Sequence, residues 1–90
     1  MRKIEYHSSF KKDYKKAVKR GYDISKLIEV IELLAIGNEL PQRYKDHELQ
    51  GAYKDYRECH ITSDWLLIYQ ISDDSLVLCL TRTGTHSDLF

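Results

Sequence analysis

The pattern of hydrophobic and polar positions predicts a short strand followed by a helix in the first part of the chain. Residues 2–6 (RKIEY) alternate weakly between the two classes, as a half-buried strand does. A helix is expected to follow as far as about Gly21, with Ser8 or Ser9 as its N-cap. Its apolar stripe has the i, i+4, i+7, i+8 spacing of one helix face. The stripe consists of Phe10, Tyr14, Ala17 and Val18.

A second helix is predicted by the apolar spacing within KLIEVIELLAI. It is expected to begin around Asp23 or Ser25. Gly37 and Asn38 can end it in left-handed backbone geometry, and Pro41 prevents it from resuming. The two helices therefore form a hairpin. The residues expected to face inward are Leu27, Ile28, Ile31, Leu34 and Ala35.

The second half of the chain predicts a long connection followed by three strands. Residues 40–51, within NELPQRYKDHELQG, show no hydrophobic period, and connections of this length in compact domains are often functional. Residues 62–63 (TS) and 72–74 (SDD) suit tight turns between the strands of an antiparallel meander. The segments that they separate are rich in aromatic and branched residues and read YKDYRECHI, DWLLIYQI and SLVLCLTR.

These elements together predict an α+β fold in a single domain of residues 1–90. A short N-terminal strand and a two-helix hairpin precede an antiparallel β-meander, whose inner face the helices are expected to cover. A length of 90 residues with 42% hydrophobic content suits one modest core and is too small for two.

The composition of the chain indicates its cellular location and bears on whether it forms disulfides or binds a metal. No stretch approaches the roughly 18 uninterrupted apolar residues of a membrane span, and MRKIEYHSSF lacks the apolar run of a secretory signal. We therefore expect a cytoplasmic protein with no membrane association. Cys59 and Cys79 stand alone rather than as a CxxC pair, and disulfides are unusual in a reducing compartment. Both are expected to be buried small residues, and no cofactor or metal is expected.

The net charge of zero conceals a strong segregation of charge along the chain. Residues 1–20 hold eight basic and two acidic residues, a balance of +6, so the remaining seventy residues carry −6. Such asymmetry can mean that one face meets a polyanion while the whole molecule stays neutral. Alternatively, the lysines are the solvated side of an ordinary amphipathic helix. The pattern alone favours neither interpretation.

Strand parity places a basic residue at the end of the last strand. Alternate positions there put a row of leucines on one face, and the same parity carries Arg82 to the end of the strand, where the core stops. His86 follows across the turn formed by residues 83–85. The leucines are Leu76, Leu78 and Leu80.

The turns of the meander can bring further polar residues to the same edge of the sheet. His60 ends one strand while Asp64 and Trp65 begin the next, so the intervening turn holds them close together. If the turn after the last strand folds back, a single cluster of titratable side chains is expected. Its members would be His47, His60, Asp64, Arg82 and His86.

Several ordered motifs carry a resemblance to a known family. The series KDHELQG, YKDYRECH, DWLLIY, RTGTH and LF closely resembles the YafQ branch of the RelE/ParE toxin superfamily. These proteins are ribosome-dependent ribonucleases of type II toxin–antitoxin systems. The motifs span residues 45–90, and the preceding strand and helical pair match the order of the family's elements. The resemblance implies a RelE-like microbial ribonuclease fold and an mRNA interferase that inhibits translation.

The chemistry of RNA cleavage explains why such residues would gather. Without a metal, a base must take the 2′-hydroxyl proton, a cation must stabilise the charged phosphorane, and an acid must protonate the departing 5′-oxygen. By resemblance, His47, His60, Asp64 and His86 fall on positions required for cleavage. We expect His86 to be the general acid, with Asp64 and one of His47 or His60 on the base side. The sequence leaves open which group is the base, since a carboxylate can instead orient a histidine. Arg82 is the expected cation, because guanidinium donors match phosphate oxygens at any working pH.

The other matched positions suit RNA binding. Trp65 and Phe90 are expected to stack against or wedge beside the exposed bases of an mRNA codon. Lys45 is expected to contact RNA, whereas Arg57 is either a structural ion-pair partner or an RNA contact. The simpler interpretation of both aromatic residues is that they close the core.

Two other classes of function remain as alternatives. A zinc module could use His and Cys residues, but their wide spacing and the absence of paired ligands argue against it. A RelE-like scaffold that only binds an antitoxin is the stronger competitor, although all four expected proton-transfer positions are present. The residues that a zinc module could use are His47, Cys59, His60, Cys79 and His86.

The resemblance also implies partners. The ribosome would present mRNA in its decoding site, and the basic segment of residues 1–20 would contact ribosomal RNA in a salt-dependent manner. A RelB/DinJ-like antitoxin would wrap the toxin and cover its cleft. Any DNA binding would come chiefly from that antitoxin, because this chain has no convincing recognition helix.

Overall fold

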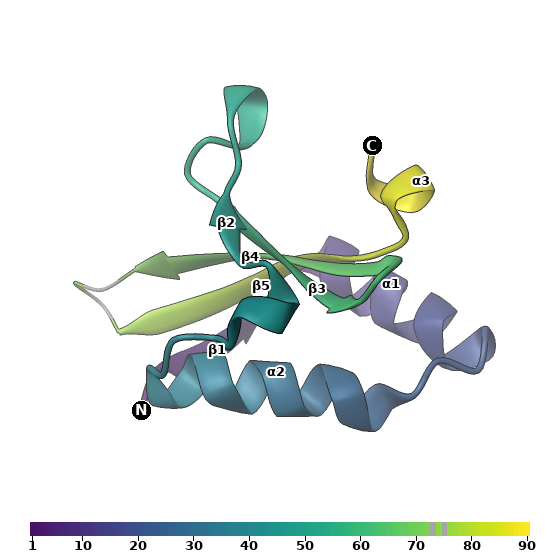
Figure 1. Ribbon diagram of the computed structural model, residues 1–90, viewed down its shortest axis with the longest axis horizontal. Helices are drawn as coiled ribbons and strands as arrows, with labels where there is room; N and C mark the ends of the chain where they lie inside the picture. Colours follow the sequence, from purple (N-terminus) through teal and green to yellow (C-terminus); the bar gives the residue numbers. More distant parts are fainter. Residues whose placement is uncertain (73, 75) are drawn as a thin grey trace.

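The computed structural model describes residues 1–72, 74 and 76–90 as a five-stranded mixed sheet with two helices on one face. The strand order is β1-β5-β4-β3-β2, and α1 and α2 lie on the opposite side of the sheet from the short helix α3 (Figure 1). The expected α+β fold is confirmed. The elements are β1 (Lys3–Tyr6), α1 (Ser8–Lys19), α2 (Ile24–Ile36), η1 (Gln42–Tyr44), β2 (His47–Glu48), η2 (Gly51–Tyr53), β3 (Arg57–Thr62), β4 (Trp65–Ser72), β5 (Val77–Gly84) and α3 (His86–Leu89).

The first helix begins one residue earlier than its predicted caps. His7 is the N-cap, and its side chain accepts a hydrogen bond from the backbone N–H of Ser9. Phe10 and Ala17 are buried as predicted, but Tyr14 and Val18 are 37% and 51% exposed, so the predicted stripe is wrong at these two positions. The reason is that α1 packs on β5 through a narrow face, of which only Phe10 and Ala17 are buried.

The second helix matches its predicted limits but not all of its predicted face. Asp23 caps its first turn, and Gly37 ends it with a φ of 89°, in the left-handed region that favours glycine. Val30 is fully buried, whereas Ile28 is 47% exposed and Ile31 is half-buried. The prediction for Ile28 is therefore wrong. The buried residues of α2 are Leu27, Val30, Leu34 and Ala35.

The predicted meander is confirmed in strands β3, β4 and β5, which pair antiparallel in chain order. The first strand, β1, joins the sheet parallel to β5. Residues 40–51 are not an unstructured connection, because they contain η1, β2 and the start of η2. A two-residue strand such as β2 has no period that a sequence pattern could reveal. The turn between β3 and β4 falls at residues 63–64, and the other predicted turn lies partly outside the described residues, at position 73.

The parity argument for the last strand holds only in part. Leu78 and Leu80 are fully buried, but Leu76 is 60% exposed with a φ of 52°, so its predicted place in the row is wrong. The register between β4 and β5 also shifts, because Tyr69 pairs with Leu80 while its neighbour Ile68 pairs with Arg82. A bulge of this kind changes the face to which the following residues point.

Side chains of β4 separate two cores on opposite faces of the sheet. Leu67 and Tyr69 belong to the main core beneath α1 and α2, whereas Leu66 and Ile68 belong to a smaller core that includes Leu89 of α3. The smaller core lies on the face that carries the candidate site.

Two further expectations concern the cysteines and membranes. Cys59 is buried as predicted, but Cys79 is only half-buried. Within the described residues, no helix is both long and apolar enough to cross a membrane.

Candidate active site

A buried carboxylate lies between two of the predicted site histidines. His47 on β2 is directly opposite Glu58 on β3, and His60 follows two residues later on the same face. One carboxylate oxygen of Glu58 lies 3.5 Å from Nε2 of His47 and 4.0 Å from Nε2 of His60. The two imidazole rings are 6.4 Å apart between centroids. Glu58 is 6% exposed and its other oxygen has no hydrogen-bond partner among the described residues.

The backbone fixes the tautomer of His47. Its Nδ1 lies 2.7 Å from the carbonyl oxygen of Lys45, which can only accept a hydrogen bond. Nδ1 therefore carries the hydrogen, so in the neutral ring Nε2 presents its lone pair toward Glu58. Lys45 adopts a left-handed backbone conformation with a φ of 50°, which turns its carbonyl toward the ring.

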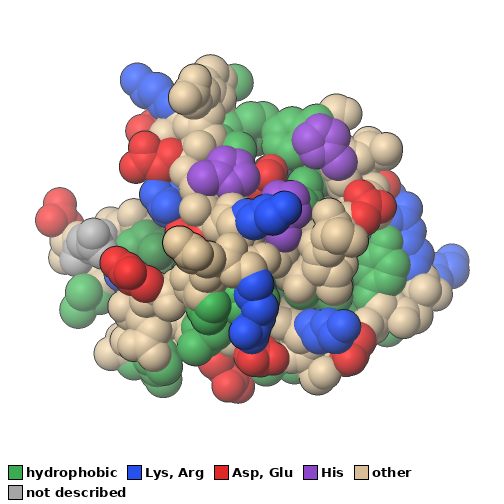
Figure 2. Space-filling view, viewed as in Figure 1, with side chains coloured by type: hydrophobic (Ala, Val, Ile, Leu, Met, Phe, Trp, Pro, Cys, Tyr) green, Lys and Arg blue, Asp and Glu red, His purple; other side chains and the backbone are tan. Residues whose placement is uncertain are grey.

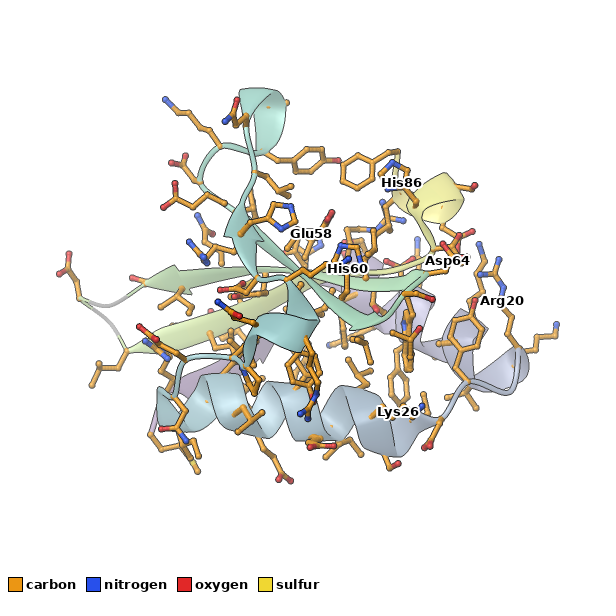
Figure 3. All side chains as sticks on the ribbon, in the orientation of Figure 1. Arg20, Lys26, Glu58, His60, Asp64 and His86 are labelled. Atoms are coloured by element: carbon orange, nitrogen blue, oxygen red, sulfur yellow. The ribbon has the colours of Figure 1, made fainter. Side chains whose placement is uncertain are left out.

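His86 lies on α3, on the same side of the sheet as Glu58 and His60 (Figure 3). Thr85 caps α3 through a reciprocal capping box with Asp88, and Leu89 anchors the helix in the smaller core. The ring of His86 lies 5.0 Å from that of Phe90, between centroids. His86 is exposed, and its side chain makes no hydrogen bond within the described residues.

Phe90 is held in an aromatic contact that crosses from α3 to η2. Its ring meets that of Tyr53 edge to face at 5.9 Å, and Tyr53 in turn meets Tyr56 at 6.0 Å. Phe90 is still 54% exposed, so its ring is accessible from solvent. Figure 2 shows histidine side chains on this face of the molecule with basic and acidic side chains between them.

Asp64 lies in the turn between β3 and β4 and is exposed. It lines a pocket of about 280 Å³ together with Lys26 and Tyr22. Figure 3 places Asp64 between His60 and the end of α1, below α3. The structure therefore brings His47 and His60 together beside Glu58 on the face that carries His86, whereas Asp64 lies at the end of the sheet, in a pocket that Lys26 of α2 also lines.

Arg82 is engaged in an ion pair with α1. Its Nε lies 2.6 Å from an Asp13 oxygen, and its Nη2 lies 3.2 Å from the other. The carboxylate of Asp13 also accepts the backbone N–H of Thr83. This hydrogen-bonded carboxylate raises the pKa of Arg82 above its ordinary value, so the side chain is a fixed cation. Its other amino group, Nη1, is left for an incoming acceptor.

The position of Trp65 does not match the expected base-stacking role. Trp65 is only 4% exposed, and its indole Nε1 donates to the hydroxyl of Thr83 at 2.9 Å. Tyr22 packs on it at 4.9 Å between ring centroids. The ring therefore closes the core, which is the alternative that the sequence left open, and it could not stack on a base without leaving this packing.

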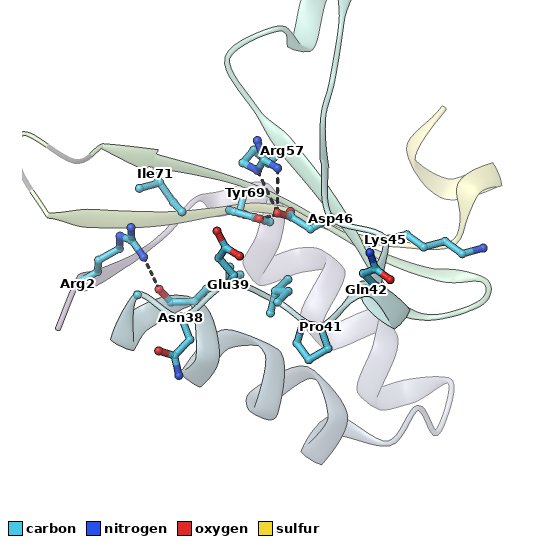
Figure 4. Close-up of a pocket in the computed structure, with 13 residues that line it drawn as sticks. Arg2, Asn38, Glu39, Pro41, Gln42, Lys45, Asp46, Arg57, Tyr69 and Ile71 are labelled. Atoms are coloured by element: carbon cyan, nitrogen blue, oxygen red, sulfur yellow. Dashed lines mark hydrogen bonds and ion pairs between the residues drawn. The ribbon is translucent and has the colours of Figure 1, made fainter.

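Arg57 faces away from the histidines, into a pocket of about 510 Å³ that Figure 4 shows in close-up. Its guanidinium pairs with Asp46 at 2.9 Å and with Glu48 at 3.5 Å. Tyr69 donates its hydroxyl to Asp46 in the same network, and burial raises the pKa of Tyr69 above its ordinary value. Of the two roles left open for Arg57, these contacts favour structural ion pairing. Lys45, by contrast, is exposed at the rim of this pocket.

Glu58 is the site residue that the sequence argument missed. Its spacing of two from His60 put both residues on one strand face, which was a usable signal. Its burial and its contact with His47 depend on the pairing of β2 with β3, which no local pattern reveals. Among the described residues, no group of three His, Cys, Asp or Glu side chains is arranged to hold a metal ion.

Comparison with known proteins identifies the family. The model of the family described as "Bacterial toxin of type II toxin-antitoxin system, YafQ" matches residues 2–90. The chain is 48% identical to the mRNA interferase toxin YafQ of Escherichia coli K12, over 99% of this chain and 96% of that protein. The crystal structure of YafQ from E. coli BL21(DE3) superimposes with a TM-score of 0.93 at 45% identity, covering 100% of this chain and 99% of that one. The toxin in the E. coli DinJ–YafQ complex gives a TM-score of 0.92 at 46% identity, again over 100% and 99% of the two chains. The chain therefore belongs to the YafQ family of bacterial toxins from type II toxin–antitoxin systems.

Proposed function

We propose that this chain cleaves ribosome-bound mRNA by a metal-independent acid–base reaction on the sheet face that carries Glu58 and His86. As a YafQ toxin, it is an mRNA interferase, that is, an endoribonuclease. The observation that carries the mechanism is the buried carboxylate of Glu58 within 3.5 Å of His47 and 4.0 Å of His60. We take the whole of residues 1–90 as one catalytic domain.

The base side of the reaction is assigned to the histidines that face Glu58. In the neutral tautomer of His47, Nε2 carries the lone pair beside Glu58, and His60 offers a second imidazole near the same carboxylate. Either ring can take the 2′-hydroxyl proton, and Glu58 stabilises the imidazolium that results. Asp64 is exposed at the adjacent turn, where it can orient the ribose or the second histidine. This arrangement supports two interchangeable bases, which agrees with the alternatives that the sequence left open.

The acid side is assigned to His86. An exposed imidazole on a capped helix can donate a proton to the departing 5′-oxygen. Arg82 supplies a permanent positive charge for the phosphorane through the part of its guanidinium that Asp13 leaves unused. Phe90, beside His86, offers a ring face or edge to a base of the codon. Lys45 adds a cation next to His47.

The partners follow from the charge of α1 and from the relatives. Lysines on the exposed side of α1 would contact ribosomal RNA, and the ribosome would place the reaction in the cytoplasm. Because the E. coli YafQ toxin forms a complex with DinJ, we propose a RelB/DinJ-like antitoxin for this chain. The lysines concerned are Lys11, Lys12, Lys15 and Lys16.

Analysis of the cleaved ends tests the mechanism. Attack by the 2′-hydroxyl leaves a 2′,3′-cyclic phosphate on one fragment and a free 5′-hydroxyl on the other. The downstream fragment, recovered from programmed ribosomes, should therefore accept a labelled phosphate from polynucleotide kinase without prior phosphatase treatment. Fragments that carry a 5′-phosphate and a 3′-hydroxyl would refute this chemistry. Intact mRNA after incubation with folded protein would favour a scaffold that only binds its antitoxin.

A further inference from the structure

A bidentate ion pair joins the end of α1 to α3, 68 residues further along the chain. Nη1 of Arg20 lies 2.6 Å from one oxygen of Asp88, and Nη2 lies 3.1 Å from the other. Arg20 follows the last residue of α1 as its C-cap, and Figure 3 shows its side chain extending from that end of α1 toward α3. Parallel hydrogen bonds of this kind fix the relative orientation of the two groups as well as their distance.

Asp88 serves α3 itself at the same time. The oxygen nearest Arg20 also accepts the backbone N–H of Thr85 at 2.9 Å, and the Thr85 hydroxyl accepts the N–H of Asp88 at 3.2 Å. The hydrogen bond from Arg20, followed by that from Thr85, holds the pKa of Asp88 well below its usual range. Asp88 therefore stays charged under physiological conditions, and one carboxylate ties together the first turn of α3 and the end of α1.

The backbone before α3 is shaped to admit this carboxylate. A Cβ atom at Gly84 would lie 3.0 Å from both Cβ and an oxygen of Asp88. A larger residue at this position would push Asp88 away from Thr85 and Arg20. The RTGTH motif therefore has a glycine at position 84 because the Asp88 side chain approaches the backbone closely there, and not because the residue takes part in the reaction.

His86 depends on these contacts for its position. A helix of four residues has a single turn of backbone hydrogen bonds, which is too little to stabilise it alone. Leu89 is its buried anchor, and the exposed His86 ring packs on Phe90 without a hydrogen bond to any described residue. The direction in which His86 and Phe90 point is therefore set by how α3 is held, and Arg20 is the side chain outside α3 that holds it by charge.

We propose that Arg20 and Asp88 are positioning residues for mRNA cleavage, whose ion pair fixes α3 and thereby places His86 and Phe90 over the scissile phosphate. Neither residue needs to touch the substrate. Arg82 is tied to α1 in the same manner through Asp13, so α1 sets the position of both the expected cation and the expected acid. The inference rests on the proposed ribonuclease function.

The test compares Arg20→Gln, Asp88→Asn and the double variant in single-turnover cleavage on programmed ribosomes. The amide oxygen introduced by Asp88→Asn can still accept from Thr85, so this substitution removes the charge while keeping the cap. Lys19→Gln is the matched control, because Lys19 is the exposed neighbour of Arg20 and loses the same charge without an ion pair within the described residues. We expect Arg20→Gln and Asp88→Asn each to lower the cleavage rate at saturating toxin by roughly ten- to a hundredfold, because a small displacement of a catalytic group reduces the rate by about this much.

The pattern across the variants separates positioning from other roles. The double variant should be no slower than the slower single variant, because both remove one interaction. Arg20→Lys should recover part of the rate. The toxin concentration for half-saturation should stay close to that of Lys19→Gln, and hydrogen exchange of the α3 amides should quicken in Arg20→Gln while the sheet stays protected.

Three outcomes would overturn the inference while leaving the proposed function intact. The first is a wild-type cleavage rate at saturating toxin in both Arg20→Gln and Asp88→Asn. The second is an effect on the half-saturating toxin concentration alone, equal to the effect of Lys19→Gln. The third is a rate loss in the double variant equal to the combined losses of the two single variants. If the wild-type protein itself failed to cleave ribosome-bound mRNA, the proposed function would fail instead.

Discussion

Replacing Glu58 with glutamine should slow mRNA cleavage without weakening the fold. Glutamine has nearly the same shape as glutamate but carries no charge, so the imidazolium formed at His47 or His60 would lose its neighbouring carboxylate. The carboxylate is 6% exposed, and one of its oxygens has no partner among the described residues. Burying an incompletely paired charge is costly, and water can solvate the half-exposed His47, so we expect the free energy of unfolding to stay close to that of the wild type.

The distance to His47 sets the size of the effect on cleavage. Two unit charges 3.5 Å apart interact by about 1 kcal/mol in a water-like medium and by about 5 kcal/mol at an effective dielectric constant of about 20. The His47 side chain is 48% exposed, which favours the lower part of this range. We therefore expect the activation free energy to rise by roughly 1–3 kcal/mol, which corresponds to a rate lower by roughly 5- to 150-fold.

The assay is single-turnover cleavage of a defined mRNA on programmed ribosomes, with thermal unfolding measured on the same preparations. Glu48→Gln is the matched control, because Glu48 follows His47 on the opposite face of β2, is 77% exposed and pairs with Arg57 rather than with a histidine. Equal cleavage rates for Glu58→Gln and Glu48→Gln would refute the role assigned to the buried carboxylate. A lower unfolding temperature for Glu58→Gln would show that the charge is structural.

Three further predictions concern other parts of the molecule. Trp65→Phe should lower the free energy of unfolding by roughly 1–3 kcal/mol, because it leaves a cavity and removes the indole hydrogen bond to the Thr83 hydroxyl, which keeps only its bond to the Leu66 carbonyl. The affinity for the ribosome should stay unchanged in a binding assay. Since the pKa of Asp88 lies below its usual value of 3.8, its contribution to stability is present above about pH 4 and is lost as the pH falls below it. Unfolding curves of the wild type and Asp88→Asn should therefore differ at neutral pH and converge in acid. Replacing the exposed lysines of α1 with glutamine should weaken ribosome binding and flatten its dependence on salt, whereas an unchanged salt slope would contradict the proposed contact with ribosomal RNA; the lysines are Lys11, Lys12, Lys15 and Lys16.

Local pattern was sufficient for the elements that depend on local physics. The capping of α2 by Asp23, its end at Gly37 and the pairing order of the meander all follow from residues close together in the sequence. The face of each helix was harder to predict, because it depends on the surface against which the helix packs. Val18 and Ile28 continue apolar stripes in the sequence but stay about half exposed in the fold.

The candidate site likewise has a part that the sequence predicted and a part that it did not. The motifs predicted the residues that lie on one side of the sheet, His60 and His86 among them, whereas the contacts that position them join distant segments. Arg82 was expected to be the cation at the end of its strand, and nothing in the sequence indicated that it pairs with Asp13, 69 residues earlier. Glu58 acquires its place between two histidines only when β2 pairs with β3. Such contacts come from tertiary pairing, which the spacing of residues along the chain does not encode.

Toeprinting of a defined mRNA on programmed ribosomes tests the central claim most directly. Wild-type protein would be compared with His86→Gln and with the same mRNA lacking ribosomes. His86 is exposed and its side chain makes no hydrogen bond to any described residue, so the variant should keep its fold. We expect cleavage within the codon of the decoding site, dependent on ribosomes and largely lost in His86→Gln. Full cleavage by the variant would contradict the assignment of the acid, and intact mRNA with folded wild-type protein would contradict the ribonuclease function itself.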